Sequence, residues 1–282
     1  MAHQIKIVTD STCDLPDSIL KEYDISMVPL TVRFGKESFR DRVDISTREF
    51  LERLGKSGEF PSTSQVPVGE FVEVFDRLGR ENEHVLGLFI SGKLSGTCQS
   101  AVIAKNVLGF ENIHIIDTKL TTFALGMVVI EAARMAADGC SLHEITERVE
   151  YMADNTHSMI ILGTLTYVEK GGRIGAGTAL VGNLLNILPV VTFSDGEVKF
   201  LDKIRGAKRI KKWVYDSFES FDLDFSDRVV GINHIGCDEL VSELKKDIGN
   251  RFGVKEFVIG TVGSVIGTYS GPDMALGVYF VK

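Results

Sequence analysis

Hydroxyl side chains and glycines follow an apolar run at residues 85–90 of this sequence, and a predicted helix comes next. Ser91, Ser95 and Thr97 are interleaved there with Gly92 and Gly96. Glycines let the backbone approach a ligand closely. The first N–H groups of a helix have no partner within the helix and carry partial positive charge. This junction is therefore suited to hold an anion.

A second hydroxyl cluster, Ser62, Thr63 and Ser64, precedes another amphipathic helix. Serine and threonine are also ordinary helix caps, because their side-chain oxygens accept from the first N–H groups. One capping residue would suffice for each helix, and both clusters hold more hydroxyls than that. The residues alone leave ligand binding and helix capping open.

The motifs of catalytic and cofactor-binding sites are incomplete. Residues 87–93 resemble a phosphate-binding loop, but Leu94 stands where a serine or threonine must reach the magnesium ion. No G-x-S-x-G turn occurs, so the nucleophile elbow of a serine hydrolase is missing. The six histidines are scattered, whereas a zinc site needs several clustered donors. We therefore expect no catalytic residue, no metal and no cofactor.

Charge and composition narrow the class of protein. The 282 residues include 39 acidic and 31 basic side chains, and the formal net charge of −8 argues against nucleic acid as a partner. No apolar run is long enough to cross a bilayer, and no signal segment opens the sequence. The four cysteines lack a disulfide-like spacing. We expect a soluble cytoplasmic protein without an integral membrane segment.

The order of predicted elements indicates two α/β domains. In residues 1–155 strand-like runs alternate with helical patterns, which is typical of a parallel sheet covered by helices. In residues 156–282 the pattern is mixed α+β, with a hairpin predicted at Asp195-Gly196. A chain of this length usually forms two domains. The predicted strands lie at 5–9, 25–34, 85–90, 113–117, 159–162, 228–233 and 275–281, and two later helices at 207–221 and 237–251.

Several helix starts carry capping signals. Residues 46–49 and 141–144 read as capping boxes, and Asp14 with Pro16 is expected to start the first helix. The segment 260–272 is rich in glycine and poor in charge, so we expect it to be tightly packed or to touch a ligand.

Eight segments, in the same order along the chain, resemble the DegV family of bacterial fatty-acid-binding proteins. They are IVTDSTCDLP (7–16), STSQVP (62–67), ISGKLSGTCQSA (90–101), IDT (116–118), EKGGRI (169–174), LNILP (185–189), KIRG (203–206) and IGTYSGP (266–272).

The resemblance implies a long-chain, palmitate-like fatty acid between two α/β domains, with its tail in an apolar tunnel. It also implies that a separate fatty acid kinase subunit phosphorylates the carboxylate to an acyl phosphate for phospholipid synthesis, so that this chain is not itself an enzyme. By position, the residues expected to bind the carboxylate are Thr63, Ser64, Ser95, Gly96 and Tyr269, and those expected to face the partner are Arg173 and Arg205.

One residue departs from the family pattern. Tyr269 stands where the family usually has histidine in a Gly-x-His-x-Gly-Pro segment, and tyrosine cannot become cationic near neutral pH. The departure keeps open a lipid sensor or structural lipid-binding protein without a kinase. A third alternative is an acyl hydrolase that uses Ser95 or Thr63 as its nucleophile.

Some apolar side chains could line a tunnel, although such residues are more often ordinary core: Phe60, Phe71, Phe75, Phe89, Phe123, Leu165 and Leu184.

Overall fold

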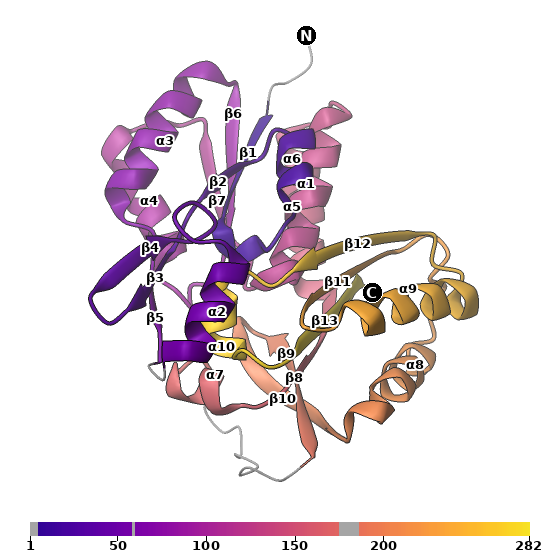
Figure 1. The fold of residues 1–282 in the computed structure, drawn as a ribbon. Coiled ribbons are helices and arrows are strands. Elements are labelled where there is room, and N and C mark those ends of the chain that lie inside the picture. Colours follow the sequence, from indigo (N-terminus) through magenta and orange to yellow (C-terminus); the bar gives the residue numbers. More distant parts are fainter. Residues whose placement is uncertain (1–4, 58–59, 175–185) are drawn as a thin grey trace.

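The fold is built on two large sheets, each covered by helices, in a computed structural model that describes residues 5–57, 60–174 and 186–282 (Figure 1). The first large sheet has four parallel strands in the order β2-β1-β6-β7. The second has six strands in the order β10-β9-β8-β13-β11-β12. Only β11 and β12 run parallel in this second sheet, so it is mixed.

The first sheet is buried on both faces, as parallel sheets usually are. Along β1, Ile5 and Ile7 pack toward α5 and α6, whereas Val8 packs toward α3 and α4. Figure 1 shows α3 and α4 on one side of this sheet and α1, α5 and α6 on the other. The strands and helices are β1 (Ile5–Asp10), β2 (Ser26–Val28), β6 (His84–Phe89), β7 (Ile113–Asp117), α1 (Asp17–Glu22), α3 (Val68–Glu81), α4 (Thr97–Leu108), α5 (Thr122–Ala137) and α6 (Leu142–Asn155).

The single strand predicted at 25–34 is wrong, because the chain divides there between two sheets. β2 ends at Val28, and β3 (Thr31–Phe34) begins a small antiparallel sheet with β4 (Glu37–Arg40) and β5 (Ser62–Ser64). Pro29 lies at the break, and proline has no N–H to donate to a sheet. Helix α2 (Thr47–Ser57) follows β4.

The second sheet carries α8 and α9 on one face, while its other face turns toward the first sheet. The predicted hairpin is confirmed, since β9 and β10 pair antiparallel around Asp195 and Gly196, both with positive φ. The strands and helices of this part are β8 (Thr156–Leu162), β9 (Ile187–Ser194), β10 (Glu197–Arg205), β11 (Val229–Ile235), β12 (Glu256–Thr261), β13 (Ala275–Val281), α7 (Thr166–Lys170), α8 (Ile210–Ser220) and α9 (Asp238–Phe252). The described residues also include two short 3-10 helices: η1 (Ser11–Cys13) follows β1, and η2 (Ala207–Arg209) follows β10.

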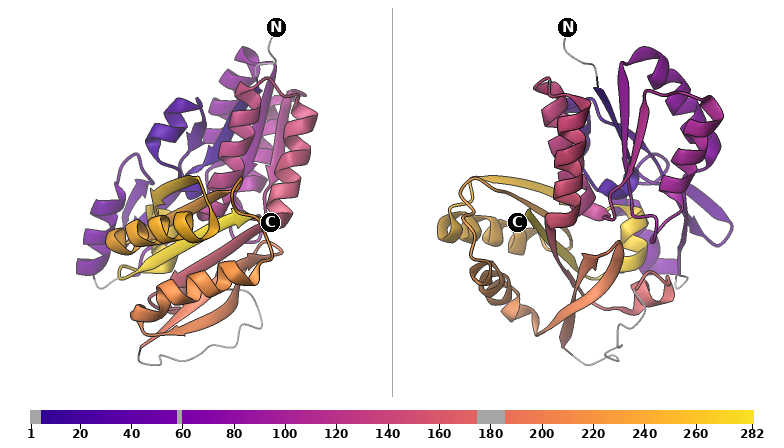
Figure 2. Two further views of the ribbon diagram at one scale, coloured as in Figure 1. Left: turned by 90° about the vertical axis from the view of Figure 1, so that its right-hand side faces the viewer. Right: turned by 180° about the vertical axis from the view of Figure 1, so that it is seen from behind.

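The glycine-rich segment at 260–272 contains a short helix, α10 (Ser264–Ser270), that leaves the second sheet. It packs against α2, β3, β5 and η1 from the first part of the chain and against α7 from the second. The two parts are therefore interlocked, as the views in Figure 2 show. The boundary between residues 155 and 156 stays a prediction.

The capping expectations have two outcomes. Both capping boxes are confirmed by reciprocal bonds within 46–49 and 141–144. The expectation for Asp14 is wrong: α1 begins after Pro16 without a side-chain cap, and the Asp14 side chain is directed elsewhere.

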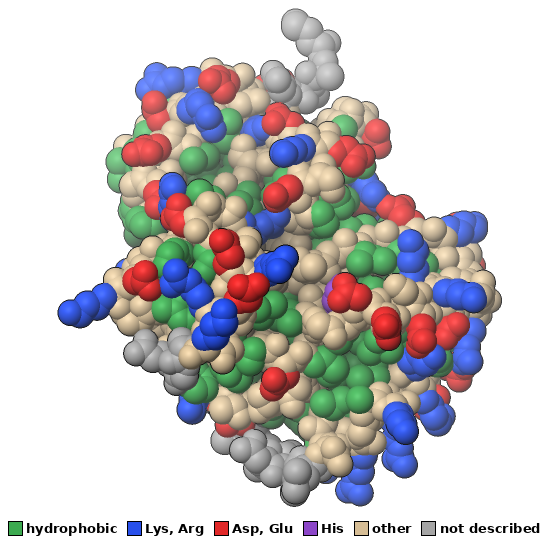
Figure 3. Space-filling view, in the orientation of Figure 1, with side chains coloured by type: hydrophobic (Ala, Val, Ile, Leu, Met, Phe, Trp, Pro, Cys, Tyr) green, Lys and Arg blue, Asp and Glu red, His purple; other side chains and the backbone are tan. Residues whose placement is uncertain are grey.

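On the face shown in Figure 3, acidic and basic side chains are interspersed, and no large basic area appears. No helix in the described ranges is long and apolar enough to span a bilayer.

Candidate ligand-binding site

The cavity between the two large sheets, hereafter the interface cavity, has a volume of about 360 Å³. Its lining comes from both parts of the chain: Leu30, Thr63, Ser64, Gln65, Ile90, Leu94, Ser95, Gly96, Thr121, Thr122, Ile160, Leu162, Val168, Arg173, Val191, Phe193, Val198, Asn233, Val262, Val265, Ile266, Tyr269, Ser270, Ala275, Gly277 and Tyr279.

Thr63 and Tyr269 meet at this cavity. Their hydroxyl oxygens lie 2.6 Å apart, which is a hydrogen bond in which either can donate. Thr63 is held on β5 opposite Val32 of β3, and Tyr269 is carried by α10. A hydroxyl that accepts a hydrogen bond from its neighbour keeps its own O–H available to donate to an anion. The pair can therefore present one donor to a carboxylate.

Ser95, Gly96 and Thr97 form the start of α4 at the same cavity. The Ser95 hydroxyl lies 2.9 Å from the Thr97 hydroxyl and accepts from the Thr97 N–H at 3.3 Å. The Val66 N–H donates to the Thr97 hydroxyl at 3.4 Å. These bonds fasten the chain after β5 to the start of α4, so the two hydroxyl clusters of the sequence lie side by side.

Gln65 also lines this cavity, although it is not among the residues expected from the sequence to bind the carboxylate. Its amide nitrogen donates to the Ser100 hydroxyl at 2.8 Å, which holds the side chain across Gly96. A Cβ atom on Gly96 would lie 2.1 Å from the Gln65 Oε1 atom. Glycine at position 96 therefore leaves room for the Gln65 amide over the start of α4. The available signal was the position of Gln65 directly after the hydroxyl cluster.

The two arginines expected at the surface lie in different places. Arg173 lines the interface cavity and is exposed. Its Nη1 donates to the Gly171 carbonyl at 2.7 Å, its Nε donates to the Leu94 carbonyl at 3.3 Å, and its Cζ lies 5.5 Å from the Tyr269 ring centre. Arg205, at the end of β10, is exposed and does not line the cavity.

Most of the apolar lining comes from the second sheet, where alternate residues along a strand face the cavity. β8 contributes Ile160 and Leu162, and β9 contributes Val191 and Phe193. A spacing of two residues is typical of one face of a strand, and this pattern was missed in the sequence.

The residues predicted to line a tunnel are not among the lining residues of the described chain. Five of them belong to the hydrophobic core: Phe71, Phe75, Phe89, Phe123 and Leu165. Phe60 is exposed and contacts Tyr167, and Leu184 lies outside the described residues.

A buried polar network borders another part of the cavity. Asn233 Nδ2 donates to the Thr122 hydroxyl at 2.7 Å and to Asp14 Oδ2 at 3.2 Å. The Thr122 hydroxyl donates to Asp14 at 2.6 Å, and the Tyr279 hydroxyl donates to Asn233 Oδ1 at 3.1 Å. Burial raises the pKa of Asp14 to about 7 and raises the pKa of Tyr279. No local pattern predicts this network, because Asp14 and Asn233 are 219 residues apart.

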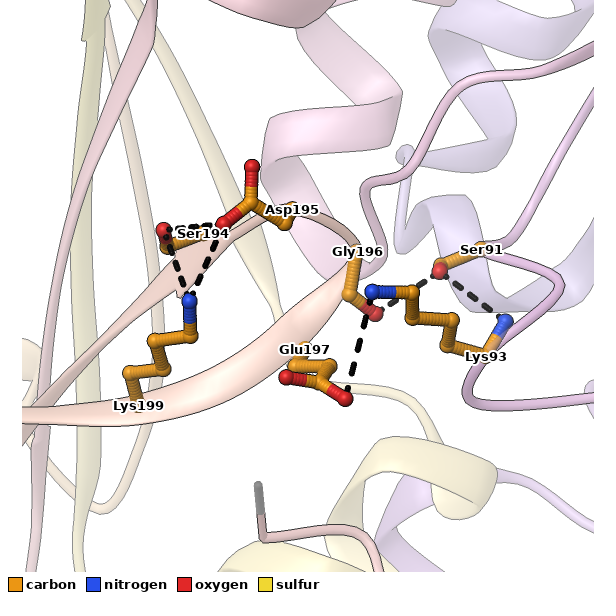
Figure 4. Close-up of polar contacts among 7 residues, drawn as sticks. All are labelled: Ser91, Lys93, Ser194, Asp195, Gly196, Glu197 and Lys199. Carbon is orange, nitrogen blue, oxygen red and sulfur yellow. Dashed lines mark hydrogen bonds and ion pairs between the residues drawn. The ribbon is translucent and has the colours of Figure 1, made fainter. Parts of the chain in front are cut away.

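A hairpin tip closes one side of the junction between the two sheets (Figure 4). The Ser91 hydroxyl donates to the Gly196 carbonyl at 2.8 Å, and the Lys93 Nζ lies 3.9 Å from a Glu197 carboxylate oxygen. A Cβ atom on Gly196 would lie 2.6 Å from the Ser91 hydroxyl, and the residue has φ of +78°. The tip of β9 and β10 therefore needs glycine to seat against the loop after β6.

The hydroxyls of the site do not form a nucleophile and base pair. Among the described residues, the side-chain bonds of Thr63 and Ser95 go to Tyr269 and Thr97, which are also hydroxyls. An activated serine or threonine needs a base within hydrogen-bond reach. The described part of the chain also contains no group of three or more histidine, cysteine, aspartate or glutamate side chains placed to hold a metal ion.

Comparisons with known proteins agree along the whole chain. A family model described as "Uncharacterised protein, DegV family" matches residues 4–282. A DegV domain-containing protein of Caldanaerobacter subterraneus subsp. tengcongensis is 37% identical over 277 residues, which is 98% of each chain.

Solved structures give the same result. A fatty-acid-binding DegV family protein of Thermus thermophilus matches with a TM-score of 0.91 at 29% identity, over 99% of this chain and 100% of that one. A stearic acid-binding protein of Eubacterium ventriosum matches with a TM-score of 0.89 at 26% identity, over 99% of this chain and 98% of that one.

Proposed function

The chain belongs to the DegV family, and on that premise we propose that it binds a long-chain fatty acid in the interface cavity, with the carboxylate at Thr63 and Ser95. The observation that carries the proposal is the meeting of both hydroxyl clusters and the start of α4 at one end of an apolar cavity. Similar proteins from Thermus thermophilus and Eubacterium ventriosum are described as binding fatty acid and stearic acid, respectively.

The volume and the lining suit such a ligand. A cavity of about 360 Å³ falls within the range of about 300–1,000 Å³ that is usual for small-molecule sites. Burying about fourteen methylenes contributes on the order of 11 kcal/mol before association costs of at least roughly 4 kcal/mol. The tail then supplies most of the affinity, whereas the hydroxyls orient the ligand and offset the desolvation of its carboxylate.

Native mass spectrometry of the purified protein, followed by lipid extraction, tests whether an acyl chain is bound. We expect a C16 to C18 acid in stoichiometric amount. Absence of any co-purified acyl chain, together with no binding of added palmitate, would remove the proposal.

The role of Thr63 is tested with Thr63→Val, which keeps the side-chain shape and removes the hydroxyl. A hydrogen bond to a charged group is worth about 1.5–3 kcal/mol, so palmitate affinity should fall about 10-fold to 150-fold. Thr261→Val, at an exposed threonine on β12, is the matched control and should leave affinity unchanged. Equal affinity of the Thr63 variant and the unaltered protein would contradict this placement of the carboxylate.

We further propose that a separate kinase phosphorylates the presented carboxylate to an acyl phosphate. The support is the family resemblance, together with exposed Arg173 beside Tyr269 at the cavity and exposed Arg205 at the end of β10. A kinase candidate should make acyl phosphate, trapped as hydroxamate, from ATP and the palmitate-loaded protein. Arg205→Ala, at an exposed arginine that does not line the cavity, should slow this reaction without weakening palmitate binding.

Tyr269 favours a second candidate function, a lipid sensor without a kinase. The tyrosine hydroxyl is already bonded to Thr63 and cannot supply the positive charge of a protonated histidine. Kinase-dependent acyl phosphate formation by the unaltered protein would exclude the sensor. Formation only in Tyr269→His would favour it.

A further inference from the structure

Two buried aspartates of the first part of the chain hold the start of α10. The Gly263 N–H donates to Asp14 Oδ1 at 2.9 Å, and the Ser264 N–H donates to Asp41 Oδ1 at 3.1 Å. Asp14 is 3% exposed and Asp41 is 0% exposed. The first N–H groups of a helix need partners from outside the helix, and the helix dipole favours negative charge there. The two carboxylates therefore anchor this end of α10.

The anchor requires glycine at position 263. A Cβ atom on Gly263 would lie 2.8 Å from Asp14 Oδ1 and 3.5 Å from Asp41 Oδ2. The φ of Gly263 is −73°, so the requirement is close approach and not an unusual backbone angle. Any side chain here would push the helix start away from Asp14.

The other end of α10 carries Tyr269, whose hydroxyl contacts that of Thr63. Tyr269 lies six residues after Gly263, about 9 Å along a helix. The Gly267 N–H donates to the Gly263 carbonyl at 2.8 Å, so the turn is closed. A Cβ atom on Gly267 would lie 2.7 Å from the Phe50 ring, which leaves the helix no space to slide on that side. A displacement of the helix start at Gly263 should therefore also move the Tyr269 hydroxyl.

We propose that Asp14 and Asp41 are positioning residues for the ligand head group: by anchoring the start of α10, they set the Tyr269 hydroxyl against Thr63. The inference rests on the proposed function, because it assumes that Thr63 meets a carboxylate. Neither aspartate touches the ligand head group in this account. Both act through a helix that comes from the other end of the sequence.

The test compares two ligands of equal length in four proteins. Affinities for palmitate and for hexadecan-1-ol are measured in the unaltered protein, in Asp14→Ala, which removes the acceptor of the Gly263 N–H, in Tyr269→Phe and in the double variant. Each single change should lower palmitate affinity about 10-fold and hexadecanol affinity less than about 2-fold, which is the size of one lost hydrogen bond. The double variant should lose no more than either single variant, because both changes break the same linkage.

Two results would overturn the proposal. If Asp14→Ala weakens the binding of palmitate and of hexadecanol equally, the residue supports only the general structure. If the losses of Asp14→Ala and Tyr269→Phe multiply in the double variant, the two residues act independently.

A second variant and a ligand-free measurement keep the test decisive. Gly263→Ala should reproduce the loss of palmitate selectivity, whereas Gly69→Ala, where a Cβ meets nothing within 4 Å, is the control and should not. Hydrogen exchange of the α10 amides should be faster in Asp14→Ala and in Gly263→Ala without ligand.

The exchange measurement also separates this inference from the proposed function. If the unaltered protein binds neither ligand, the proposed function fails. If hydrogen exchange at α10 is unchanged in both variants, the anchoring of α10 is rejected, whatever the protein binds.

Discussion

Exchanging Asp14 and Asn233 tests the buried network that joins the two parts of the chain. Asp14 accepts three hydrogen bonds, from the Gly263 N–H, the Thr122 hydroxyl and the Asn233 amide. In Asp14→Asn, the new amide nitrogen meets the Asn233 amide nitrogen, and two donors face each other. An unsatisfied buried donor costs about 1–3 kcal/mol.

The reverse change should cost more, and the double exchange should recover the loss. Asn233→Asp places a second carboxylate beside Asp14, where one of the two must take up a proton. In the double variant, an amide at position 14 donates to a carboxylate at position 233, which replaces the original pair with its direction reversed. Gly263 still finds an acceptor at position 14, and the Tyr279 hydroxyl still donates to position 233. The Thr122 hydroxyl then donates to position 233 and accepts from position 14.

Calorimetric unfolding of the four proteins measures the coupling. With about 2–4 °C of Tm for each kcal/mol in a chain of this size, each single variant should lose several degrees, and the double variant should return to within about 2 °C of the unaltered protein. Additive losses in the double variant would refute the network, because independent sites do not compensate each other.

Three further predictions use other parts of the structure. Burial raises the pKa of Asp14 to about 7, so near neutral pH the folded protein holds a proton that the unfolded chain has released. Tm should therefore rise as pH falls from 8 to 7, and Asp14→Asn should flatten this slope. The window lies above the unfolded-state pKa of His157, whose lowered pKa of about 4 in the folded protein makes it act in the opposite direction at lower pH. Gly69→Ala, on an open face of α3, should stabilise the protein by about 0.5–1 kcal/mol in a denaturant titration. Ser91→Ala removes the bond to the Gly196 carbonyl and should speed hydrogen exchange at the tip of the β9–β10 hairpin, whereas unchanged exchange would show that the tip is held by other contacts.

Local patterns predicted much of the fold. The strands at 5–9, 85–90, 113–117 and 275–281 and the hairpin at Asp195-Gly196 follow from apolar runs and turn residues, and the structure confirms them. The run at 25–34 misled because it is apolar through most of its length, and only Pro29 marked the change of sheet.

The site was predictable where its residues lie close in sequence or match the family motifs. Thr63, Ser95 and Gly96 belong to two hydroxyl clusters that the fold brings together. The bond between Thr63 and Tyr269 spans 206 residues, and the contacts of Asp14 with Asn233 and Gly263 span 219 and 249. Such contacts depend on how the two sheets pack, which no local pattern encodes. Asp14 was therefore assigned to the nearest helix, although it holds a distant one.

A crystal structure of the protein with palmitate is the most direct test of the account. We predict that the carboxylate lies within hydrogen-bond distance of the Thr63 and Ser95 hydroxyls and that the tail runs along Ile160 and Val191 of the second sheet. A carboxylate at Asn233 instead, or an acid bound outside the interface cavity, would contradict it.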